Sequence, residues 1–156
     1  MISLIAALTR ERVIGKGNAI PWRIPSDMQN FRSVTAGNVV IMGRKTWESI
    51  PEKYRPLPDR VNIVVSSSQK RAKGAIVCDS MAAAIEKAKG HGKEIFIIGG
   101  ASIYGQSIGF ADRMYLSWVR KDYPGDAYFP DFSGNDWQVI ERREFPEYEY
   151  EVYQRK

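Results

Sequence analysis

The sequence predicts a single-domain α/β fold with a central, mostly parallel sheet, an antiparallel C-terminal edge and about four flanking helices. Three observations predict it. Short apolar runs, typical of strands buried on both faces, alternate with segments of helical pattern along the chain. The last two such stretches have the pattern of a closing antiparallel pair. The 156 residues correspond to one domain, residues 1–156, which is long enough to bury a sizeable core.

The expected strands are apolar runs that polar residues or glycines terminate. They cover residues 2–8, 38–42, 61–65, 76–78, 94–98, 114–119, 137–140 and 148–153. The expected helices lie between them, at residues 26–35, 46–50, 81–89 and 101–107. The third helix has a candidate cap in Asp79 or Ser80 and ends at Gly90. Residues 43–46 are expected to form a turn into the second helix.

The segment at residues 14–31 begins as a loop rich in glycine and proline and then becomes a helix, with Ser26 as a candidate cap. Asp27, Phe31 and Val34 lie at i, i+4 and i+7, hence on one face of that helix. Asp27 has two interpretations. It is an acid that meets the positive end of the helix dipole, or a half-buried carboxylate at a cleft, whose raised pKa lets it hold or relay a proton.

The net charge of +5 and the isoelectric point near 9.3 favour anionic partners. The basic residues are scattered, so a phosphorylated cofactor or a carboxylate substrate is favoured over nucleic acid. No apolar run approaches the ~20 residues of a membrane span. Arg10 and Arg12 follow the apolar run at residues 2–8, the reverse of a signal peptide. Cys78, the only cysteine, permits no intrachain disulfide and is expected to be buried; we expect a cytoplasmic protein.

Several common chemistries are excluded. His91 is the only histidine, and one histidine with one cysteine cannot form the usual zinc site, so no metal is expected. A Ser–His–Asp triad would depend on His91, which no nucleophile elbow accompanies. The glycines at 15 and 17 begin like a dinucleotide fingerprint, but Ile20 stands in place of the third glycine. Residues 37–46 do not have the spacing of a phosphate-binding loop.

Two sites of phosphate-binding type remain. Gly99 and Gly100 follow a buried strand and begin a helix, where backbone N–H groups can meet an anion; the alternative is a tight turn. Residues 43–46 begin a second helix with two cations and a hydroxyl; the alternative is a solvated basic turn. Arg44 with the serines at 66–68 could hold one more phosphate. Because ligands of parallel sheets bind beyond the carboxyl ends of the strands, we expect these segments at that edge.

Short motifs follow one another along nearly the whole chain. They are Ile5-Ala6-Ala7, Ile14-Gly15, Pro21-Trp22, Asp27, the run from Met42 to Trp47, the run from Arg55 to Arg60, Ile98-Gly99-Gly100-Ala101 with Tyr104, and the run from Gly125 to Pro130. Each is weak alone, but in this order they closely resemble the dihydrofolate reductase family, in particular its bacterial chromosomal type. In that family a cis peptide bond joins the two glycines that match Gly99 and Gly100, so the resemblance implies one here.

The resemblance implies transfer of a hydride from NADPH to C6 of dihydrofolate, with protonation at N5. The product, tetrahydrofolate, supports one-carbon metabolism and the synthesis of thymidylate and purines. The resemblance also implies antifolate inhibitors as ligands, a monomer, and no nucleic-acid or membrane partner. Because the nicotinamide carries the hydride, the protein has to hold two rings face to face, supply a proton and exclude water.

The resemblance implies roles for individual residues. Asp27 matches the acid that binds the pterin through both carboxylate oxygens, and Arg60 matches the arginine that pairs with the α-carboxylate of the substrate. The residues implied in catalysis are Asp27, Trp22, Ser117 and Tyr104. Those implied in substrate binding are Ile5, Ala6, Asp27, Met28, Phe31, Ile50, Leu57, Arg60, Ile98 and Ser117. Those implied in cofactor binding are Ala7, Ile14, Asn18, Ala19, Ile20, Gly43, Arg44, Lys45, Thr46, Ser66, Ser67, Gly99, Gly100, Ala101, Ser102, Ile103 and Tyr104.

Within these sets, Arg44 and Ser66 match the residues that would read the 2′-phosphate and so select NADPH over NADH. Residues 15–22 match the mobile lid of the family, and Gly125 and Asp126 match the loop that packs against it. Ser117 stands where the family usually has threonine, so a hydroxyl is kept and a packing methyl is lost.

Two alternatives stay open at this point. A reductase of riboflavin synthesis, acting on a ribosylated pyrimidine, would share the sheet and the glycine turn, but it is not expected to carry Asp27 and Arg60 together. A noncatalytic nucleotide-binding or nucleic-acid-binding protein would fit the charge of +5. The scattered basic residues and Asp27 oppose that second alternative.

Overall fold

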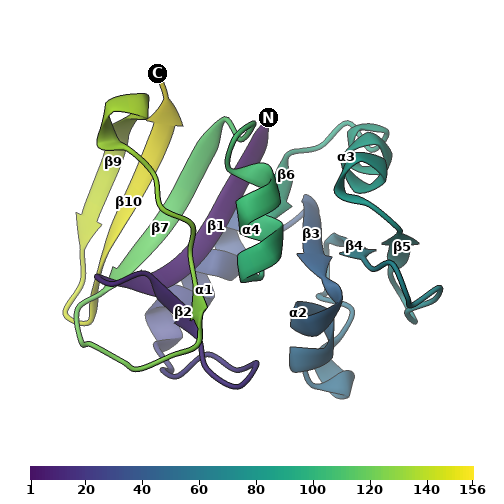
Figure 1. The fold of residues 1–156 in the computed structure, drawn as a ribbon, viewed down its shortest axis with the longest axis horizontal. Helices are drawn as coiled ribbons and strands as arrows, with labels where there is room; N and C mark the ends of the chain where they lie inside the picture. The colour runs from purple at the N-terminus through teal and green to yellow at the C-terminus, as the bar shows by residue number, and fades with distance from the viewer.

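An eight-stranded sheet in the order β5-β4-β3-β6-β1-β7-β10-β9 is the centre of the computed structural model, which describes residues 1–156 (Figure 1). The strands are β1 (Ile2–Thr9), β3 (Val39–Gly43), β4 (Val61–Val65), β5 (Ile76–Cys78), β6 (Ile95–Ile97), β7 (Arg113–Val119), β9 (Trp137–Glu144) and β10 (Tyr148–Arg155). β10 is antiparallel to both β7 and β9, and all other neighbouring strands of this sheet are parallel. The predicted mostly parallel sheet with an antiparallel C-terminal edge is therefore confirmed.

Helices cover both faces of the sheet. They are α1 (Pro25–Thr35), α2 (Arg44–Ser49), α3 (Met81–Lys89) and α4 (Ala101–Ser107), with 3-10 turns at Glu52–Tyr54 and Gly134–Asp136. Ala84 of α3 and Tyr104 of α4 share one buried cluster with Leu4 of β1. On the opposite face, Phe31 of α1 packs in a second cluster with Trp47 of α2 (Figure 1, α1 behind the sheet).

The central strands are central because their side chains are apolar on both faces. Every residue of β3 is buried, and Val39, Val40, Ile41 and Met42 have no exposed surface. A strand of this kind can only lie where helices cover the sheet from both sides. The polar and charged β9, in contrast, has only Trp137 buried and forms the edge.

The structure differs from the sequence prediction at two helix starts. Helix α1 begins at Pro25, and Ile24 is its N-cap, without a side-chain hydrogen bond. The prediction that Ser26 caps this helix is therefore wrong, because Ser26 already lies in the first turn. Helix α2 begins at Arg44 directly after β3, so the turn expected at residues 43–46 does not exist. Gly43 ends the strand and is itself the N-cap.

Helix α3 follows the prediction more closely. The hydroxyl of Ser80 accepts a hydrogen bond of 3.1 Å from the N–H of Ala83, so Ser80 and not Asp79 is the side-chain cap. Cys78, predicted to be buried, is partly exposed, because it belongs to the edge strand β5.

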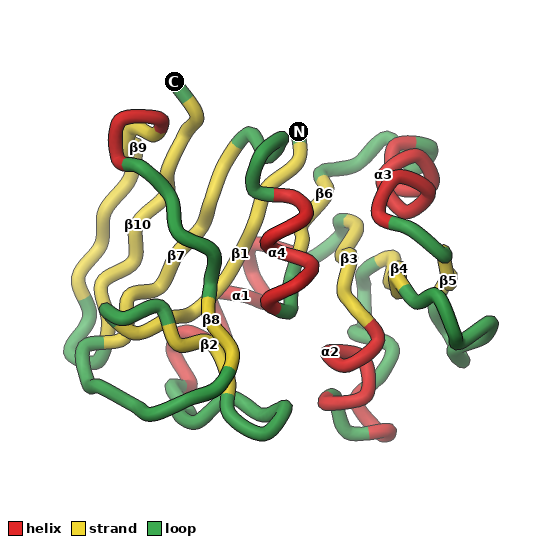
Figure 2. The backbone as a smooth tube through the Cα atoms, viewed as in Figure 1, coloured by secondary structure: helices red, strands yellow, loops and turns green.

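A separate two-stranded sheet pairs β2 (Val13–Gly15) with β8 (Ala127–Tyr128) and was not predicted. β2 has three residues and β8 two, and they form by pairing across the chain, so no local pattern marks them. This pair, the loops that follow β1 and β4, and helix α2 directly after β3 lie at the carboxyl edge of the sheet, away from the two chain termini (Figure 2). None of the helices has the length and apolar character that crossing a membrane requires.

Candidate functional site

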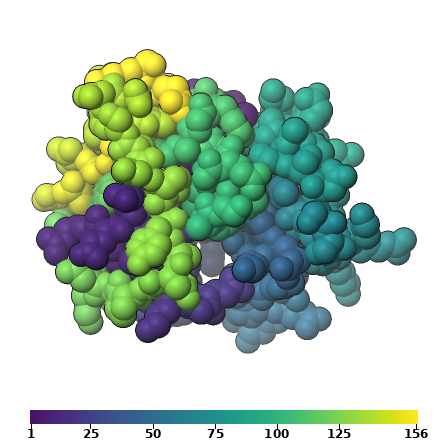
Figure 3. Space-filling view, in the orientation of Figure 1, coloured from purple at the N-terminus to yellow at the C-terminus, as the bar shows by residue number.

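A pocket of about 550 Å³ lies at the carboxyl ends of the strands, where ligands of parallel sheets bind. Figure 3 shows the hollow between the purple loop after β2, the blue helix α2 and the green helix α4. The pocket is lined by Ala7, Ile14, Gly15, Asn18, Ala19, Ile20, Gly43, Arg44, Lys45, Thr46, Ser49, Val65, Ile98, Gly99, Gly100, Ala101, Ser102, Ile103, Tyr104 and Ala127.

All but two of the residues predicted for the cofactor line this one pocket; Ser66 and Ser67 do not. The prediction missed Gly15, Ser49, Val65 and Ala127. Helical spacing could have identified Ser49, because it lies four residues after Lys45 and three after Thr46, both predicted, on the same helix. Ala127 had none, because it reaches the pocket through the unpredicted pairing of β8 with β2.

Two glycine turns meet at the floor of the pocket. The N–H of Gly43 donates a hydrogen bond of 2.8 Å to the carbonyl of Gly99. A Cβ on Gly43 would lie 2.9 Å from Cγ1 of Ile103, so only glycine allows this approach. Gly99 has a φ of +122°, and the peptide bond between Gly99 and Gly100 is cis, as the family resemblance implied. Neither α2 nor α4 has a side-chain cap at its first turn.

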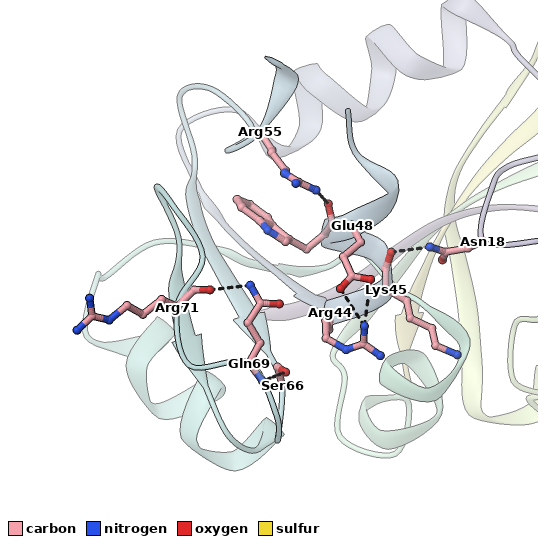
Figure 4. Close-up of polar contacts among 9 residues, drawn as sticks. Asn18, Arg44, Lys45, Glu48, Arg55, Ser66, Gln69 and Arg71 are labelled. Atoms are coloured by element: carbon pink, nitrogen blue, oxygen red, sulfur yellow. Dashed lines mark hydrogen bonds and ion pairs between the residues drawn. The ribbon is translucent and has the colours of Figure 1, made fainter. Parts of the chain in front are cut away.

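The charges of the pocket come from α2. Arg44 and Lys45 line it, and Nη1 of Arg44 donates to both carboxylate oxygens of Glu48, at 2.8 and 3.0 Å (Figure 4). Ser66 follows β4 next to Arg44, since Gly43 pairs in register with Val65. The hydroxyl of Ser66 is buried and accepts the N–H of Gln69 at 2.9 Å.

The lid segment forms one wall of the pocket and is held at several points. β2 pairs with β8, and a Cβ on Gly125 would lie 2.3 Å from the side chain of Val13, so this contact requires glycine. The N–H of Gly17 donates to the carboxylate of Asp126 at 3.1 Å. At the tip, the side-chain amide of Asn18 donates to the carbonyl of Lys45 at 3.1 Å (Figure 4). The loop at 125–126 thus packs against the lid as predicted.

Asp27 lies half-buried in the first turn of α1, on the opposite face of the sheet from α4. The hydroxyl of Ser117 on β7 donates a hydrogen bond of 2.5 Å to Oδ1 of Asp27. Burial raises the pKa of the Asp27 carboxyl, and the bond from Ser117 lowers it in part. Ser117 pairs in register with Ala7, which lines the pocket, so the acid lies beside the pocket wall.

A cluster of apolar side chains, which we call the slot, lies on the same face of the sheet as Asp27. Phe31, Ile50, Leu57 and Ile98, all partly buried, pack in one cluster with buried Ile5. Ile98 also lines the pocket, so the slot and the pocket adjoin.

Three other predicted site residues, Ala6, Met28 and Trp22, lie outside this cluster. The side chain of Ala6 belongs to the buried cluster on the other face of the sheet. Met28 is half exposed at the rim. Trp22 packs against Tyr123, with ring centroids 5.3 Å apart.

Arg60 lies at the outer end of the slot. Its Nε donates to the carbonyl of Pro58 at 2.9 Å and its Nη1 to the hydroxyl of Thr35 at 3.1 Å. The guanidinium carbon is 5.8 Å from the ring centroid of Phe31. Burial and the nearby charge of Arg32 lower the pKa of Arg60, and Asp59 raises it in part. The guanidinium forms no ion pair with a carboxylate.

Tyr104 closes the back of the pocket. Its hydroxyl is buried and donates to the carbonyl of Ile5 at 2.7 Å. Burial raises the pKa of Tyr104 well above its usual value. The phenol therefore stays neutral and its proton is already engaged, which fits a role in shaping the wall better than a role in proton transfer.

A larger and more open groove of about 1130 Å³ lies at the opposite end of the strands, between Met1, Ile85 and Phe110. None of the predicted site residues lines it. The smaller pocket is the candidate site because cations and glycine turns line it and the half-buried acid lies beside its wall.

Comparison with known proteins gives the family. A family model described as dihydrofolate reductase matches residues 1–156. The dihydrofolate reductase type 3 of Salmonella typhimurium is 44% identical over 94% of this chain and 88% of its own length. The dihydrofolate reductases of Bacillus subtilis (37% identical, 100% of this chain and 95% of that protein) and Haemophilus influenzae (42%, 94% and 86%) are also similar.

The chain belongs to the dihydrofolate reductase family. The reaction of this family is the reduction of dihydrofolate with a nicotinamide cofactor, so the enzyme class predicted from the motifs is confirmed. Membership in this family decides against a pyrimidine reductase and against a noncatalytic binding protein.

Proposed function

We propose that this enzyme uses NADPH and that the pocket beside α2 and α4 holds it, while dihydrofolate binds along the slot between Asp27 and Arg60. The observation that carries the proposal is the Ser117–Asp27 hydrogen bond of 2.5 Å, which sets a half-buried carboxylate directly behind Ala7 of the pocket wall. Substrate and cofactor sites that share this wall bring two flat rings together.

The residues of the pocket fit a phosphorylated dinucleotide. The pocket has two cations, Arg44 and Lys45, and no carboxylate among its lining residues. The close approach of Gly43 to Gly99 leaves backbone rather than side chains at the floor, where a pyrophosphate can approach. Arg44 and Ser66 are adjacent across β3 and β4, and they are our candidates for reading the 2′-phosphate.

Asp27 is our candidate for orienting the pterin and for managing the proton that goes to N5. Its two oxygens can accept hydrogen bonds from a ring N–H and an adjacent amino group at the same time. The hydroxyl of Ser117 occupies one position on Oδ1 and fixes the rotation of the carboxylate. A raised pKa keeps the proton on this site available at higher pH than an exposed aspartate would.

The slot and Arg60 would hold the rest of the substrate. Phe31, Ile50 and Leu57 offer an apolar surface for an aromatic ring. Arg60, at the far end, has no carboxylate partner and can take one from the substrate in a bidentate manner.

When bound, the nicotinamide supplies the hydride, and the chain excludes water from the reacting rings. The lid does this by covering the pocket through β2 and by the contact of Asn18 with α2. Trp22, which packs on Tyr123 beside the lid, would close the side next to the pterin.

We further propose that the enzyme is a cytoplasmic monomer. Among its large exposed apolar side chains, Ile20 lies at the lid tip, Phe110 at the opposite end of the strands and Ile140 on the edge strand β9, so these three are far apart. Light scattering coupled to gel filtration tests the monomer.

The decisive experiment follows absorbance at about 340 nm, where reduced nicotinamide absorbs, with purified protein and dihydrofolate. NADPH is supplied in one cuvette and NADH in the other. We expect a dihydrofolate-dependent decrease with NADPH and a much slower one with NADH. Equal rates with both cofactors would remove Arg44 and Ser66 from the proposed 2′-phosphate site, and no decrease with either would contradict the proposal as a whole.

A further inference from the structure

The ion pair between Arg44 and Glu48 stands at the place where the 2′-phosphate of NADPH would meet the protein. Both residues lie on α2, four positions apart, and Nη1 of Arg44 reaches both carboxylate oxygens at 2.8 and 3.0 Å (Figure 4). The two side chains are 39% and 45% exposed, so the pair is in contact with water. Glu48 itself does not line the pocket, and sequence analysis assigned it no role.

Only one of the two cations that line the pocket is paired with a carboxylate. Arg44 and Lys45 are the only charged residues that line the pocket, and both are cations. Lys45 has no ion-pair partner, whereas Arg44 already has one. One of the two positive charges available to a phosphorylated ligand is thus neutralised before the ligand arrives.

We propose that Glu48 is a specificity-determining residue: its carboxylate competes with the cofactor's 2′-phosphate for Arg44 and so limits how strongly the enzyme prefers NADPH to NADH. The inference rests on the proposed role of Arg44 in reading that phosphate. Glu48 lines neither the pocket nor the apolar slot, so we expect it to act on cofactor choice alone.

Two physical outcomes are open to Glu48 when a phosphate binds, and both lower the affinity. If Glu48 stays, its negative charge repels the phosphate from a few ångströms away. If Glu48 rotates into solvent, the hydrogen bonds to Nη1 are lost and have to be replaced. Because an exposed pair four residues apart on a helix is weak, the phosphate can displace it. NADH lacks the phosphate and is affected by neither.

The test is Glu48→Gln, which keeps the shape of the side chain and removes its charge. The probes are adenosine 2′,5′-bisphosphate and adenosine 5′-monophosphate, followed by NADPH and NADH, with dissociation constants from quenching of tryptophan fluorescence. We expect the variant to bind the two 2′-phosphorylated ligands about three- to tenfold more tightly, and the other two within about twofold of wild type.

Glu52→Gln is the matched control, since Glu52 is exposed, lies in the neighbouring 3-10 turn and forms no ion pair. It makes the same change in net charge, and we expect it to leave all four dissociation constants within about twofold. An equal gain in Glu52→Gln would show a general charge effect and overturn the proposal. Weaker or unchanged binding of the bisphosphate by Glu48→Gln would also overturn it, because the pair would then support Arg44 rather than compete for it.

Arg44→Gln separates this inference from the proposed function. If wild type binds the bisphosphate and the monophosphate equally, the proposed selection of NADPH fails and the inference fails with it. A different result would overturn the inference alone. In that result, wild type prefers the bisphosphate to the monophosphate and Arg44→Gln abolishes this preference, but Glu48→Gln leaves all four dissociation constants unchanged. In the double variant we expect the gain from Glu48→Gln to disappear.

Discussion

The hydroxyl of Ser117 donates a 2.5 Å hydrogen bond to Asp27, and it does so from the strand position that pairs with Ala7 of the pocket wall. The bond therefore connects an acid on one face of the sheet to the rim of a pocket at its edge. Burial raises the pKa of Asp27, and this bond opposes the rise by stabilising the carboxylate. The balance of the two effects sets the pH range in which the acid keeps its proton.

Ser117→Ala removes the effect that lowers the pKa of Asp27, so that pKa rises further. Because the reaction consumes a proton, the rate falls as the acid ionises, and the midpoint of that fall moves to higher pH. The measurement is kcat/KM for dihydrofolate against pH. Ser117→Thr keeps the hydroxyl and is expected to keep the midpoint of wild type. A midpoint that moves to lower pH in Ser117→Ala would contradict this account.

Asp27→Asn keeps the shape of the side chain and removes its proton chemistry. We expect the variant to fold and to bind NADPH as wild type does, while its turnover at neutral pH falls by about a hundredfold or more. Fluorescence titration measures NADPH binding, and absorbance measures turnover. Turnover like that of wild type near neutral pH would rule out the proposed role.

Asp27→Asn is also expected to change the stability of the fold in a pH-dependent way. A carboxyl whose pKa is raised in the folded state binds a proton more tightly than in the unfolded state. Its contribution to stability is therefore present at low pH and is lost as the pH rises through the folded-state pKa. At neutral pH Asp27→Asn should stabilise the protein by on the order of 1 kcal/mol, or about 2–4 °C in Tm, and the gain should vanish in acid. A calorimetric scan at two pH values checks it, and a lower Tm at neutral pH would refute it.

Arg60→Leu removes the cation proposed to bind the substrate's α-carboxylate. Loss of a charge-assisted hydrogen bond costs about 1.5–3 kcal/mol, which corresponds to a rise of about tenfold to a hundredfold in the Kd for dihydrofolate. Binding of NADPH should not change. Arg60→Lys keeps the charge but loses the planar fork, so its Kd for dihydrofolate is expected to lie between those of wild type and Arg60→Leu. An unchanged Kd in Arg60→Leu would remove Arg60 from the site.

Gly125→Ala tests the contact between the lid and its supporting loop. The added Cβ would lie 2.3 Å from Cγ1 of Val13 and 2.5 Å from the carbonyl oxygen of Gly15, so the lid has to move away. We expect kcat/KM to fall by about tenfold, with little change in Tm. Gly109→Ala is the control, since its Cβ would meet nothing within 4 Å. Equal kinetics for the two variants would show that the lid does not depend on this contact.

Elements marked by a local pattern could be predicted from the sequence, and those made only by pairing across the chain could not. The strand at Val61–Val65 and the helix at Ala101–Ser107 were predicted with their observed bounds, because a mostly apolar run defines the strand and the glycines before Ala101 mark the start of the helix. β2 and β8 were not predicted because they form by pairing across the chain, and no local sequence pattern marks them. The carboxyl end of β9 was not predicted because its exposed, charged residues do not show the apolar pattern of a strand, and β10 extends two residues beyond its predicted end.

The site could be predicted in outline for a similar reason. Arg44 and Gly99 stand at strand ends, and the rule for parallel sheets brings such ends together. The bond between Ser117 and Asp27 joins residues far apart in the chain, so no local pattern predicts it, and the family resemblance only placed both residues in the site. The pairing of Glu48 with Arg44 follows from helical spacing, but its position at the pocket rim needed the fold.

The two hydrogen bonds that hold the lid beyond β2, from Gly17 to Asp126 and from Asn18 to Lys45, are both exposed to water. Ile20 at the tip is 63% exposed, so the tip covers little apolar surface of its own. Releasing it exchanges two protein hydrogen bonds for two with water and exposes little apolar surface of the tip itself. Such a step carries a small change in heat capacity and a small response to urea. Opening and closing of the tip are therefore set by what occupies the pocket, and remain largely independent of the stability of the fold.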